Sequence, residues 1–570
     1  MASPPPRRWR LREQAPPSFL SRTSYPSLVR QLLWHRGVGS EAQARRFFGQ
    51  EPAEHDPLLL PEMEVAVARL QRAAQEGEAV AVFGDFDVDG VTAAALLTEA
   101  LTELGARVLP YIPDRYAEGY GLNVDALRRL AAQGARVLLA ADCGTTAVAE
   151  VEEALRLGMD VLVLDHHSLS PHLPPAAALV NPRRPDSRYP QSELASVGLA
   201  YKLAEALYEA LGRPFPRGRY LELVALGTVT DLVPLVDENR WLVREGLKAL
   251  SRSQRPGLRA LAQEAGLGGR EVDTWAVGWV LGPRLNAAGR LAHARQAFDL
   301  LLCRDEAAAR ELARSLSSLN RERQRLTEAA LARARQVVES APLGTLLFVA
   351  DPDTPAGIVG LVAGRLAEEF YRPAFACERG PALSRGSGRS IPGFDVAAAL
   401  RACDHLLLKH GGHPQAAGFT APTGHLEALA RALTEAAERD LKEADLSPCL
   451  DIEAVLPLRA LRGELLRWLD RFRPHGPGNP EPLFLARGVV VADVRPAGAD
   501  GQHLRLKLRD GPLTWLAFAR RLGPPAPTPG QRVDVVYSLA RDRDDQGALE
   551  LRLHDLRPSG QGGPWAIIGL

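Results

Sequence analysis

The chain has 570 residues, 46% of them hydrophobic, and its formal net charge at pH 7 is zero. This length allows roughly three to four domains, and the zero net charge excludes a global basic field as a sign of nucleic-acid binding. The five cysteines are scattered and form no C-x-x-C pair, which favours reduced thiols in the cytoplasm. No apolar run is long enough to span a bilayer, and the N-terminal residues lack the apolar stretch of a signal peptide. We therefore expect a cytoplasmic protein without membrane association.

The N-terminal residues are rich in arginine and include Trp9 and Trp34. A basic segment with interspersed aromatic residues could contact a phosphate backbone. It could equally be an arm that packs over the first domain. We treat residues 1–60 as a basic N-terminal arm and leave both alternatives open.

The most informative stretch joins a predicted strand to a predicted helix. Residues 79–83 form an apolar run, typical of a buried strand, and a helical pattern covers residues 91–104. Asp85, Asp87 and Asp89 lie between them, where sites form in open α/β sheets. Crowded carboxylates repel one another, and a divalent cation with oxygen ligands, Mg²⁺ or Mn²⁺, relieves this. Taken alone, the stretch is equally consistent with an acidic turn in which Asp89 caps the helix.

Two further apolar runs end in metal-binding side chains. Residues 136–141 lead into Asp142, and residues 160–164 lead into Asp-His-His at 165–167. If these strands are parallel, their carboxyl ends converge on one edge of the sheet. The convergence of three such strand ends favours a metal site over a structural turn.

The surrounding sequence predicts an α/β domain. Residues 61–235 alternate short apolar runs with helical patterns, which indicates a parallel sheet covered by helices. A polar loop at 113–121 contains Arg115, and a helical run over 220–230 ends at Asp231. With a metal cluster already indicated, Asp231 is the expected remaining carboxylate.

A segment rich in small residues follows, and then a long helical pattern. Residues 282–291 contain Arg284, Asn286 and Arg290, which are good phosphate donors, among residues that allow close backbone approach. Residues 293–341 contain no proline or glycine, so we expect one continuous helix connecting two domains.

Two glycine-rich segments lie in a second α/β region. Residues 384–390 include Ser387 and Arg389, and residues 410–419 include His413. We interpret both as loops that bind phosphate, although either could be a tight turn.

The C-terminal part changes character. Five short predicted strands suggest a small barrel, in particular an OB-fold, which we expect to contribute nucleic-acid affinity and not chemistry. Every candidate metal ligand lies before residue 232, so a chain that ends near residue 440 is expected to retain the chemistry of the site. The expected domains are an N-terminal arm (1–60), a catalytic α/β domain (61–292), a connecting helix (293–341), a second α/β domain (342–440) and an OB-fold-like domain (445–560).

Seven motifs, taken in order, carry a family resemblance. They lie at residues 85–90, 142–144, 165–167, 231, 283–290, 411–413 and 474–482. The first four resemble the motifs of the DHH phosphoesterase superfamily. The last three narrow the resemblance to the RecJ family, the single-strand-specific 5′→3′ DNA exonucleases of bacteria. The resemblance extends over about residues 60–560.

This resemblance implies a two-metal phosphodiesterase that uses Mn²⁺ or Mg²⁺. By analogy, Asp142 would bridge two ions, and His167 would lie near the scissile phosphate. Superfamily members often have a histidine upstream of the first aspartates, whereas this chain has Phe83 and Gly84 there. Either Asp85 supplies that ligand, or the coordination shell of the first ion is more open. The expected ligands are Asp87, Asp89, Asp142, His166 and Asp231, and the expected catalytic residues are His167, Asp85, Arg284, Asn286 and Arg290.

The resemblance also suggests how the substrate would be held. Arg115, Ser387 and Arg389 would clamp a 5′-terminal phosphate, and His413 would contact the substrate. Alternatively, Arg115 merely pairs with Asp114 or Glu118. The expected partner is single-stranded DNA with a 5′ phosphate, acted on by a monomer, with a helicase and a single-strand-binding protein expected by family analogy alone. The rival functions are an oligonucleotide or phosphoadenosine-phosphate phosphatase of the DHH type and a non-catalytic replication scaffold.

Overall fold

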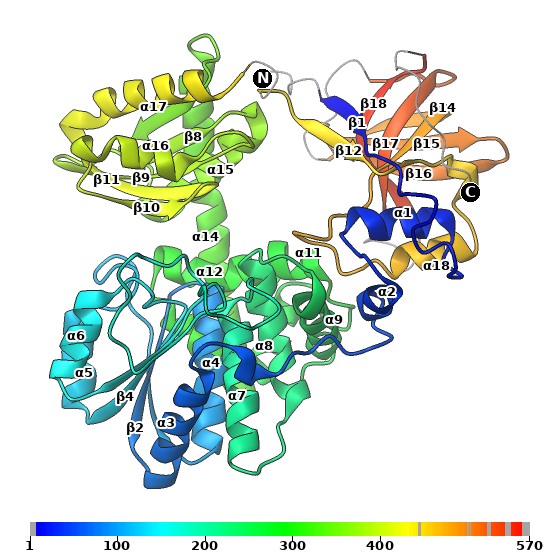
Figure 1. Cartoon of the computed structure of the whole chain (residues 1–570). Coiled ribbons are helices and arrows are strands. Elements are labelled where there is room, and N and C mark those ends of the chain that lie inside the picture. Colours follow the sequence, from blue (N-terminus) through cyan, green and yellow to red (C-terminus); the bar gives the residue numbers. More distant parts are fainter. Residues whose placement is uncertain are drawn as a thin grey trace. The chain divides into compact units, whose positions relative to one another are not determined.

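The structure, a computed structural model, consists of two compact units (Figure 1). The residues it describes are 7–442, 446–498, 501, 503–520, 526–541 and 549–560. The first unit comprises residues 40–323 and 472–480. The second comprises the described parts of 1–39, 324–471 and 481–570.

The first unit is built on a five-stranded sheet in the order β3-β2-β4-β5-β6, and every pairing is parallel. All six residues of the interior strand β2 are buried, as expected for a parallel strand covered on both faces. Because the strands are parallel, their carboxyl ends lie at one edge. The strands are β2 (Ala79–Gly84), β3 (Arg107–Tyr111), β4 (Ala135–Ala141), β5 (Asp160–Leu164) and β6 (Ala178–Val180).

Helices cover both faces of this sheet (Figure 1). Alternate residues of each strand point to opposite faces, so Val137 and Leu139 join one core cluster, whereas Leu138 and Ala140 join the other. One face carries α5 (Val124–Ala132) and α6 (Val148–Arg156). The other carries α3 (Met63–Glu76), α4 (Val88–Glu103), α7 (Ser196–Ala210), α8 (Arg217–Thr230) and α9 (Asp237–Leu250). The predicted parallel-sheet domain is confirmed.

The long helix predicted over 293–341 is not continuous. α13 ends at Leu302, and the backbone is extended at Cys303. Asp305 then caps a new helix by accepting a hydrogen bond from the Ala308 amide at 2.7 Å. A side chain that satisfies a free amide at this point favours a helix start over a helix interior. The helices here are α10 (Pro256–Glu264), α11 (Thr274–Ala276), the π-helix η2 (Val277–Leu281), α12 (Gly282–Leu291), α13 (Arg295–Leu302) and α14 (Glu306–Glu339).

Residues 7–39 are part of the second unit and not a separate arm. β1 (Arg8–Leu11) pairs in parallel with β12 (Cys449–Ile452), and α1 (Ser27–His35) leads to Arg36, which binds buried Glu453 at 2.8 Å. This part of the sequence therefore belongs with the C-terminal domain in the second unit. Only α2 (Glu41–Phe47) and the residues after it join the first unit.

The second α/β domain is a five-stranded mixed sheet in the order β10-β11-β9-β8-β7. The prediction that two segments here are loops is wrong: residues 384–390 lie mainly in strand β9, and residues 410–419 form a hairpin of β10 and β11. Their binding of phosphate stays a prediction. Its strands are β7 (Leu347–Asp351), β8 (Ala374–Glu378), β9 (Leu383–Arg389), β10 (Lys409–His413) and β11 (Ala416–Pro422). Its helices are α15 (Val359–Phe370), α16 (Val396–Ala402) and α17 (Leu426–Asp440).

Aromatic packing explains the glycines that made β9 resemble a loop. A Cβ at Gly386 would lie 2.2 Å from the Phe419 ring, and one at Gly388 would lie 2.5 Å from the Phe375 ring. Glycine is therefore required in this strand because neighbouring rings occupy the space of its side chains.

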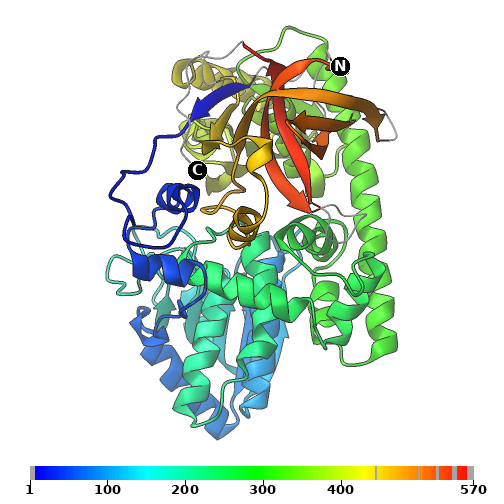
Figure 2. The ribbon, with the colours of Figure 1, turned by 90° about the vertical axis from the view of Figure 1, so that its right-hand side faces the viewer.

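The predicted five-stranded barrel is confirmed (Figure 2). It closes because β14 pairs with β15 on one side and with β17 on the other. Its strands are β14 (Phe484–Ala497), β15 (His503–Asp510), β16 (Leu513–Arg520), β17 (Arg532–Arg541) and β18 (Leu549–Pro558). The short β13 (Ala454–Val455) extends the sheet, and α18 (Glu464–Asp470) lies between β13 and β14 in the sequence.

A segment near the barrel in sequence, residues 472–480, packs in the first unit. The buried Arg240 guanidinium donates to the carbonyls of Pro474 at 3.0 Å and Arg473 at 2.8 Å. The Leu235 amide donates to the Pro477 carbonyl at 2.7 Å. Residues 472–480 are thus fixed on the sheet domain by buried hydrogen bonds.

Candidate metal centre

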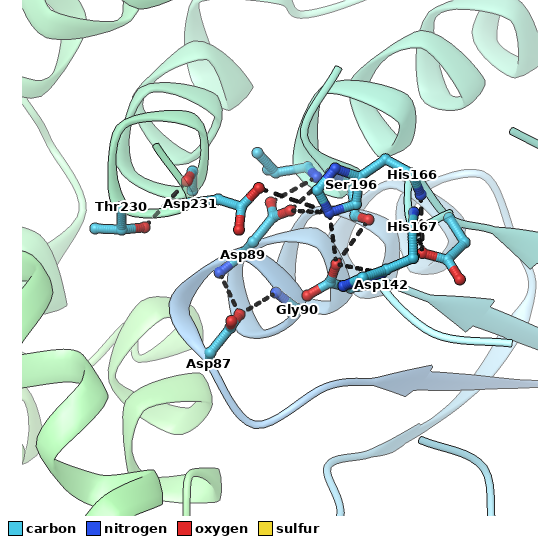
Figure 3. A network of polar contacts seen from close by, with 12 residues as sticks. Asp87, Asp89, Gly90, Asp142, His166, His167, Ser196, Thr230 and Asp231 are labelled. Carbon is cyan, nitrogen blue, oxygen red and sulfur yellow. Dashed lines mark hydrogen bonds and ion pairs between the residues drawn. The ribbon is translucent and has the colours of Figure 1, made fainter. Parts of the chain in front are cut away.

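The carboxyl edge of the parallel sheet gathers the predicted metal ligands. The side chains of Asp89, Asp142, His166 and Asp231 point toward one another (Figure 3). His166 Nε2 lies 3.3 Å from Asp142 Oδ1, 3.6 Å from Asp231 Oδ2 and 3.8 Å from Asp89 Oδ2. Asp89, Asp142 and His166 follow β2, β4 and β5, whose carboxyl ends meet at this edge, whereas Asp231 lies at the end of α8.

Three overlapping groups in this cluster have ligand atoms within 4.8 Å of one another. Asp142 belongs to two of them, so one carboxylate could serve two ions. This sharing fits the bridging role expected for Asp142, which remains a prediction. The groups are Asp142–His166–His167, Asp89–His166–Asp231 and Asp85–Asp87–Asp142.

The electrostatics of the cluster favour a bound cation. Burial and the charges of neighbouring carboxylates raise the pKa of Asp89 to about 7 and that of Asp231 to about 9. The same causes raise the pKa of Asp85 and of Asp142 well above the ordinary range. In addition, Asp85 Oδ1 is buried and accepts no hydrogen bond from any described residue. Oxygen-rich sites of this kind fit Mg²⁺ or Mn²⁺.

Asp142 is held in a strained conformation. Its φ of 67° lies in the left-handed region, which costs a non-glycine residue on the order of 1 kcal/mol or more. The Asp142 amide donates to the Leu164 carbonyl at 2.9 Å, and the Ser196 hydroxyl donates to Asp142 Oδ1 at 2.9 Å. The surrounding structure therefore fixes this carboxylate at the centre of the cluster.

Backbone amides position two more carboxylates. The first amides of α7, at Ser196 and Val197, donate to Asp89 at 2.7 and 2.9 Å. Gly227 in α8 permits this packing, because a Cβ there would lie 2.8 Å from Asp89 Oδ1. Asp87, not Asp89, caps α4, since Asp87 Oδ1 accepts from the amides of Asp89 and Gly90. The alternative in which Asp89 is merely a helix cap is therefore wrong.

Asp165 orients the histidine pair. It accepts hydrogen bonds from the amides of His166 at 2.8 Å, His167 at 3.1 Å and Thr145 at 3.0 Å, and from His167 Nδ1 at 2.7 Å. Although burial opposes its charge, these donors hold the pKa of Asp165 below the ordinary range. Burial likewise opposes the charge on His167, yet Asp165 raises the pKa of that imidazole. The sequence analysis named Asp165 within a motif but gave it no role.

Tyr120 is a second residue that sequence analysis missed. Its hydroxyl donates to the Asp142 carbonyl at 3.2 Å and lies 3.3 Å from His167 Nδ1. A single tyrosine in a polar loop gives no signal of this role. Asn181 was missed for the same reason, although its Nδ2 donates to the His167 carbonyl at 3.0 Å.

The predicted catalytic residues Arg284, Asn286 and Arg290 all lie in α12. Arg284 donates from Nη1 to the Val280 carbonyl at 2.7 Å, and burial lowers its pKa. Within the described residues, no contact joins Arg284 or Asn286 to the acidic cluster. The Arg290 carbonyl accepts a hydrogen bond from the Tyr116 hydroxyl in the polar loop. Gly289 packs α12 against the loop of the first aspartates, since a Cβ there would lie 2.7 Å from the Phe86 carbonyl oxygen.

Arg115 lies beside the cluster. Its guanidinium carbon is 4.8 Å from the centre of the Phe86 ring, and its charge opposes the rise in the pKa of Asp85. Asp114 accepts hydrogen bonds from backbone amides, and Glu118 pairs with Arg129. The simple pairing of Arg115 with either neighbour is therefore not what the structure contains.

The other predicted substrate contacts lie in the second unit. Arg389 donates from Nη1 to Ser387 Oγ at 2.7 Å, and Ser387 Oγ donates to the Ala417 carbonyl at 3.1 Å. His413 is an exposed residue at the end of β10. Ser387 and Arg389 are thus neighbours, while their meeting with Arg115 remains a prediction.

Comparisons with known protein families agree with this geometry. The chain matches three family descriptions: "DHH family, N-terminal domain" over residues 79–228, "DHHA1 domain" over 343–441 and "RecJ OB domain" over 452–555. The parallel sheet and its acidic, histidine-containing edge define the class of DHH phosphoesterases.

Named relatives narrow this class. The chain is 36% identical over 549 residues to "Single-stranded-DNA-specific exonuclease RecJ" of Bacillus subtilis, covering 93% of this chain and 69% of that protein. It is 34% identical over 484 residues to the Escherichia coli protein of the same name, covering 80% and 83%. The crystal structure of Thermus thermophilus RecJ in complex with Mn²⁺ matches with a TM-score of 0.83 at 32% identity, covering 99% and 80%. The chain belongs to the RecJ family.

Proposed function

We propose that this chain is a metal-dependent exonuclease that degrades single-stranded DNA from its 5′ end to 5′-mononucleotides in DNA recombination and repair. The observation that carries the proposal is the group of three carboxylates, from Asp89, Asp142 and Asp231, around His166 at the sheet edge. The names of the relatives support the substrate, and crystal structures of Thermus thermophilus RecJ with Mn²⁺ and with Mg²⁺ support the choice of cofactor.

The residues of the site divide the work of phosphodiester hydrolysis. When bound, a pair of divalent cations supplies Lewis-acid chemistry that neutralises phosphate charge and favours deprotonation of an attacking water. Asp89 and Asp142 are fixed by hydrogen bonds, so ligand geometry is set before binding. His167, oriented by Asp165 and carrying a raised pKa, holds a proton beside the phosphate position. Arg115 adds positive charge on the same side.

The 5′-end preference would come from a phosphate clamp. Ser387 and Arg389 are already hydrogen-bonded as a pair, and Arg115 stands at the metal centre. A guanidinium–phosphate contact is worth about 1.5–3 kcal/mol, so Arg389→Ala is expected to cost roughly tenfold to hundredfold on 5′-phosphorylated ends. Arg385→Ala, an exposed arginine on the same strand, is the matched control. Equal slowing on 5′-hydroxyl and 5′-phosphate ends would show that Arg389 is a general backbone contact.

Several finer statements belong to the same proposal. We place the enzyme in the cytoplasm as a monomer, with a helicase and a single-strand-binding protein as partners. The five cysteines are all free thiols, which is consistent with a reducing compartment. Within the described residues, no helix is long and apolar enough to cross a membrane. The domain boundaries at residues 60, 292, 341 and 440 are part of this proposal.

The test is digestion of 5′-labelled and 3′-labelled single strands beside a blunt duplex, in Mn²⁺ and in EDTA. We expect early release of the 5′ label as a mononucleotide, slow shortening of the 3′-labelled strand, an intact duplex and no cleavage in EDTA. Binding without cleavage in Mn²⁺ would indicate a non-catalytic scaffold. Cleavage confined to dinucleotides or phosphoadenosine phosphate would indicate the phosphatase alternative, against which the closed C-terminal barrel argues.

A further inference from the structure

The first unit contains a cavity of about 620 Å³ whose lining includes no residue of the metal centre. It is open to solvent and lies among the start of α8, the end of α9, the start of α10 and the end of α13. The link between α13 and α14, at Cys303 and Arg304, forms part of its wall. A volume of this order accommodates a small organic ligand.

The inner wall of the cavity is charged but already neutralised. Arg255, whose side chain is 10% exposed, binds Glu222 at 2.5 Å and Glu99 at 2.6 Å. Arg219 binds Glu99 at 2.5 Å and Glu103 at 2.7 Å. These ion pairs fix the floor of the cavity. Glu103 lies outside the lining, in which the guanidinium groups of Arg219 and Arg255 balance the carboxylates of Glu99 and Glu222.

The mouth of the cavity carries unneutralised positive charge. Arg252 and Arg304 both line it, both are exposed, and neither forms an ion pair with any carboxylate of the described chain. Lys248 also lines it and pairs with Glu245, which lies outside the lining. Two free guanidinium groups beside an ammonium group present the donors that phosphate oxygens require.

The remaining wall is apolar, with a few polar groups. Pro256, Leu301 and Leu302 form an apolar face, while Ser253 and Gln254 add hydrogen-bonding side chains. Inorganic phosphate would use only the charged mouth. A ligand that uses the whole surface needs a phosphate group and a flat or apolar part of moderate size.

We infer that this cavity binds a nucleoside monophosphate, with the phosphate at Arg252 and Arg304 and the nucleoside against the wall of Pro256, Leu301 and Leu302. The choice of a nucleotide among organic phosphates rests on the proposed function, because mononucleotides would be the enzyme's own product. A bound nucleotide would contact both the end of α13 and Arg304 in the α13–α14 link.

The test is calorimetric titration of the full chain in EDTA with dTMP, thymidine and inorganic phosphate. EDTA keeps phosphate binding at the metal centre out of the measurement. We expect dTMP to bind at least about tenfold more tightly than either fragment, since each fragment loses one set of contacts. Equal binding of inorganic phosphate would overturn the assignment of a nucleotide, and absence of binding would overturn the site.

Variants locate the binding. The double substitution R252E/R304E is expected to weaken dTMP by roughly a hundredfold, because two charge-assisted contacts are lost. Ala249→Trp is expected to block binding by filling the cavity without changing its charge. Arg270→Glu, an exposed arginine outside the lining, is the control for charge reversal and should bind normally. Thermal melting of each variant checks that it is folded.

Arg389→Ala separates this cavity from the proposed 5′-phosphate clamp, and it should leave dTMP binding in EDTA unchanged. Loss of binding in Arg389→Ala with retention in R252E/R304E would overturn the inference. Cleavage of DNA is measured separately, so a failure of the proposed function would appear as absent cleavage whatever the titration gives.

Discussion

Two buried charged clusters in the first unit show opposite designs. At Lys202, an ammonium group is enclosed by Glu238 at 2.8 Å, Glu205 at 3.0 Å and the His55 carbonyl at 2.8 Å. Burial opposes the charge of Lys202, yet these carboxylates raise its pKa, so the group is charged and fully paired. Glu238 also accepts hydrogen bonds from the His55 amide and the Tyr189 hydroxyl.

The metal centre is equally buried but has no such balance. Its carboxylates face one another, and burial with mutual repulsion raises their pKa values. A cluster of opposite charges stabilises the fold when every partner is present. A cluster of like charges costs stability and is useful only if a cation completes it. The difference separates a structural cluster from a functional one.

The largest expected effect tests the functional cluster. Asp142→Asn keeps the shape of the side chain but removes the charge shared by two ligand groups. We expect nuclease activity in saturating Mn²⁺ to fall by about 10⁴-fold or more, which is more than ~5 kcal/mol, while the protein stays folded. Turnover near that of the wild type would contradict the central role of Asp142.

The structural cluster should respond in stability instead. Glu238→Gln leaves Lys202 buried beside a neutral amide, and breaking a buried pair costs about 3–5 kcal/mol. Urea unfolding of the metal-free protein measures this. Glu245→Gln removes the partner of the exposed Lys248 and should cost at most about 1 kcal/mol. Equal effects of the two substitutions would mean that the Lys202 cluster does not stabilise the fold.

The two clusters should also differ in their response to pH. Because folding raises the pKa of Asp89 to about 7 and that of Asp231 to about 9, the folded state binds protons more tightly than the unfolded state. Stability in EDTA from this source is complete below about pH 4 and is lost as pH rises toward 9. We expect a melting temperature on the order of 5 °C lower at pH 8 than at pH 5. Asp231→Asn should reduce this dependence, and Mn²⁺ should reverse it.

The smallest expected effect concerns Asp165, which orients His167 at the edge of the metal centre. Asp165 contacts His167 but is not placed among the ligand groups. Asp165→Asn is expected to lower activity by about 10-fold to 100-fold, as loss of an orienting partner does. It should also shift the pH profile of kcat downward on the alkaline side, because the pKa of His167 falls when its carboxylate partner is lost. A lower rate with an unchanged pH profile would assign Asp165 a purely structural role.

The convergence of the candidate ligands was predictable because strand ends are readable from apolar runs. Asp142 and His166 follow such runs directly, and parallel topology brings them together. The hydrogen bonds from Ser196 and Tyr120 were not predictable, since each comes from a segment whose approach depends on tertiary packing. Hydrophobic periodicity contains no information about which loop residue meets a carboxylate.

Local composition also led to two wrong predictions, a loop at residues 384–390 and a continuous helix across residues 303–305. The Gly-Ser-Arg pattern of 384–390 is typical of a loop, but aromatic rings of the second domain occupy the space above Gly386 and Gly388. The helical pattern across 303–305 concealed the start of α14. Asp305 alone does not indicate a helix cap, because its hydrogen bond from the Ala308 amide is visible only in the structure. In both cases, tertiary context overrode a local preference.

The hydrogen bonds of Arg240 bear on how this protein can be divided for engineering. The guanidinium is buried, and two of its backbone acceptors, the carbonyls of Arg473 and Pro474, come from a segment far along the chain. Ending the chain near residue 440 would remove these acceptors and leave a cation in the interior, at a cost of roughly 3–5 kcal/mol. The expectation that such a shortened chain retains the chemistry of the site therefore leaves out one contribution. Residues 472–480 belong to the first unit and supply hydrogen-bond acceptors to its buried Arg240. A shortened enzyme that folds alone would need residues 472–480 attached through a designed linker. Alternatively, Arg240 would have to be replaced by an apolar residue of similar length.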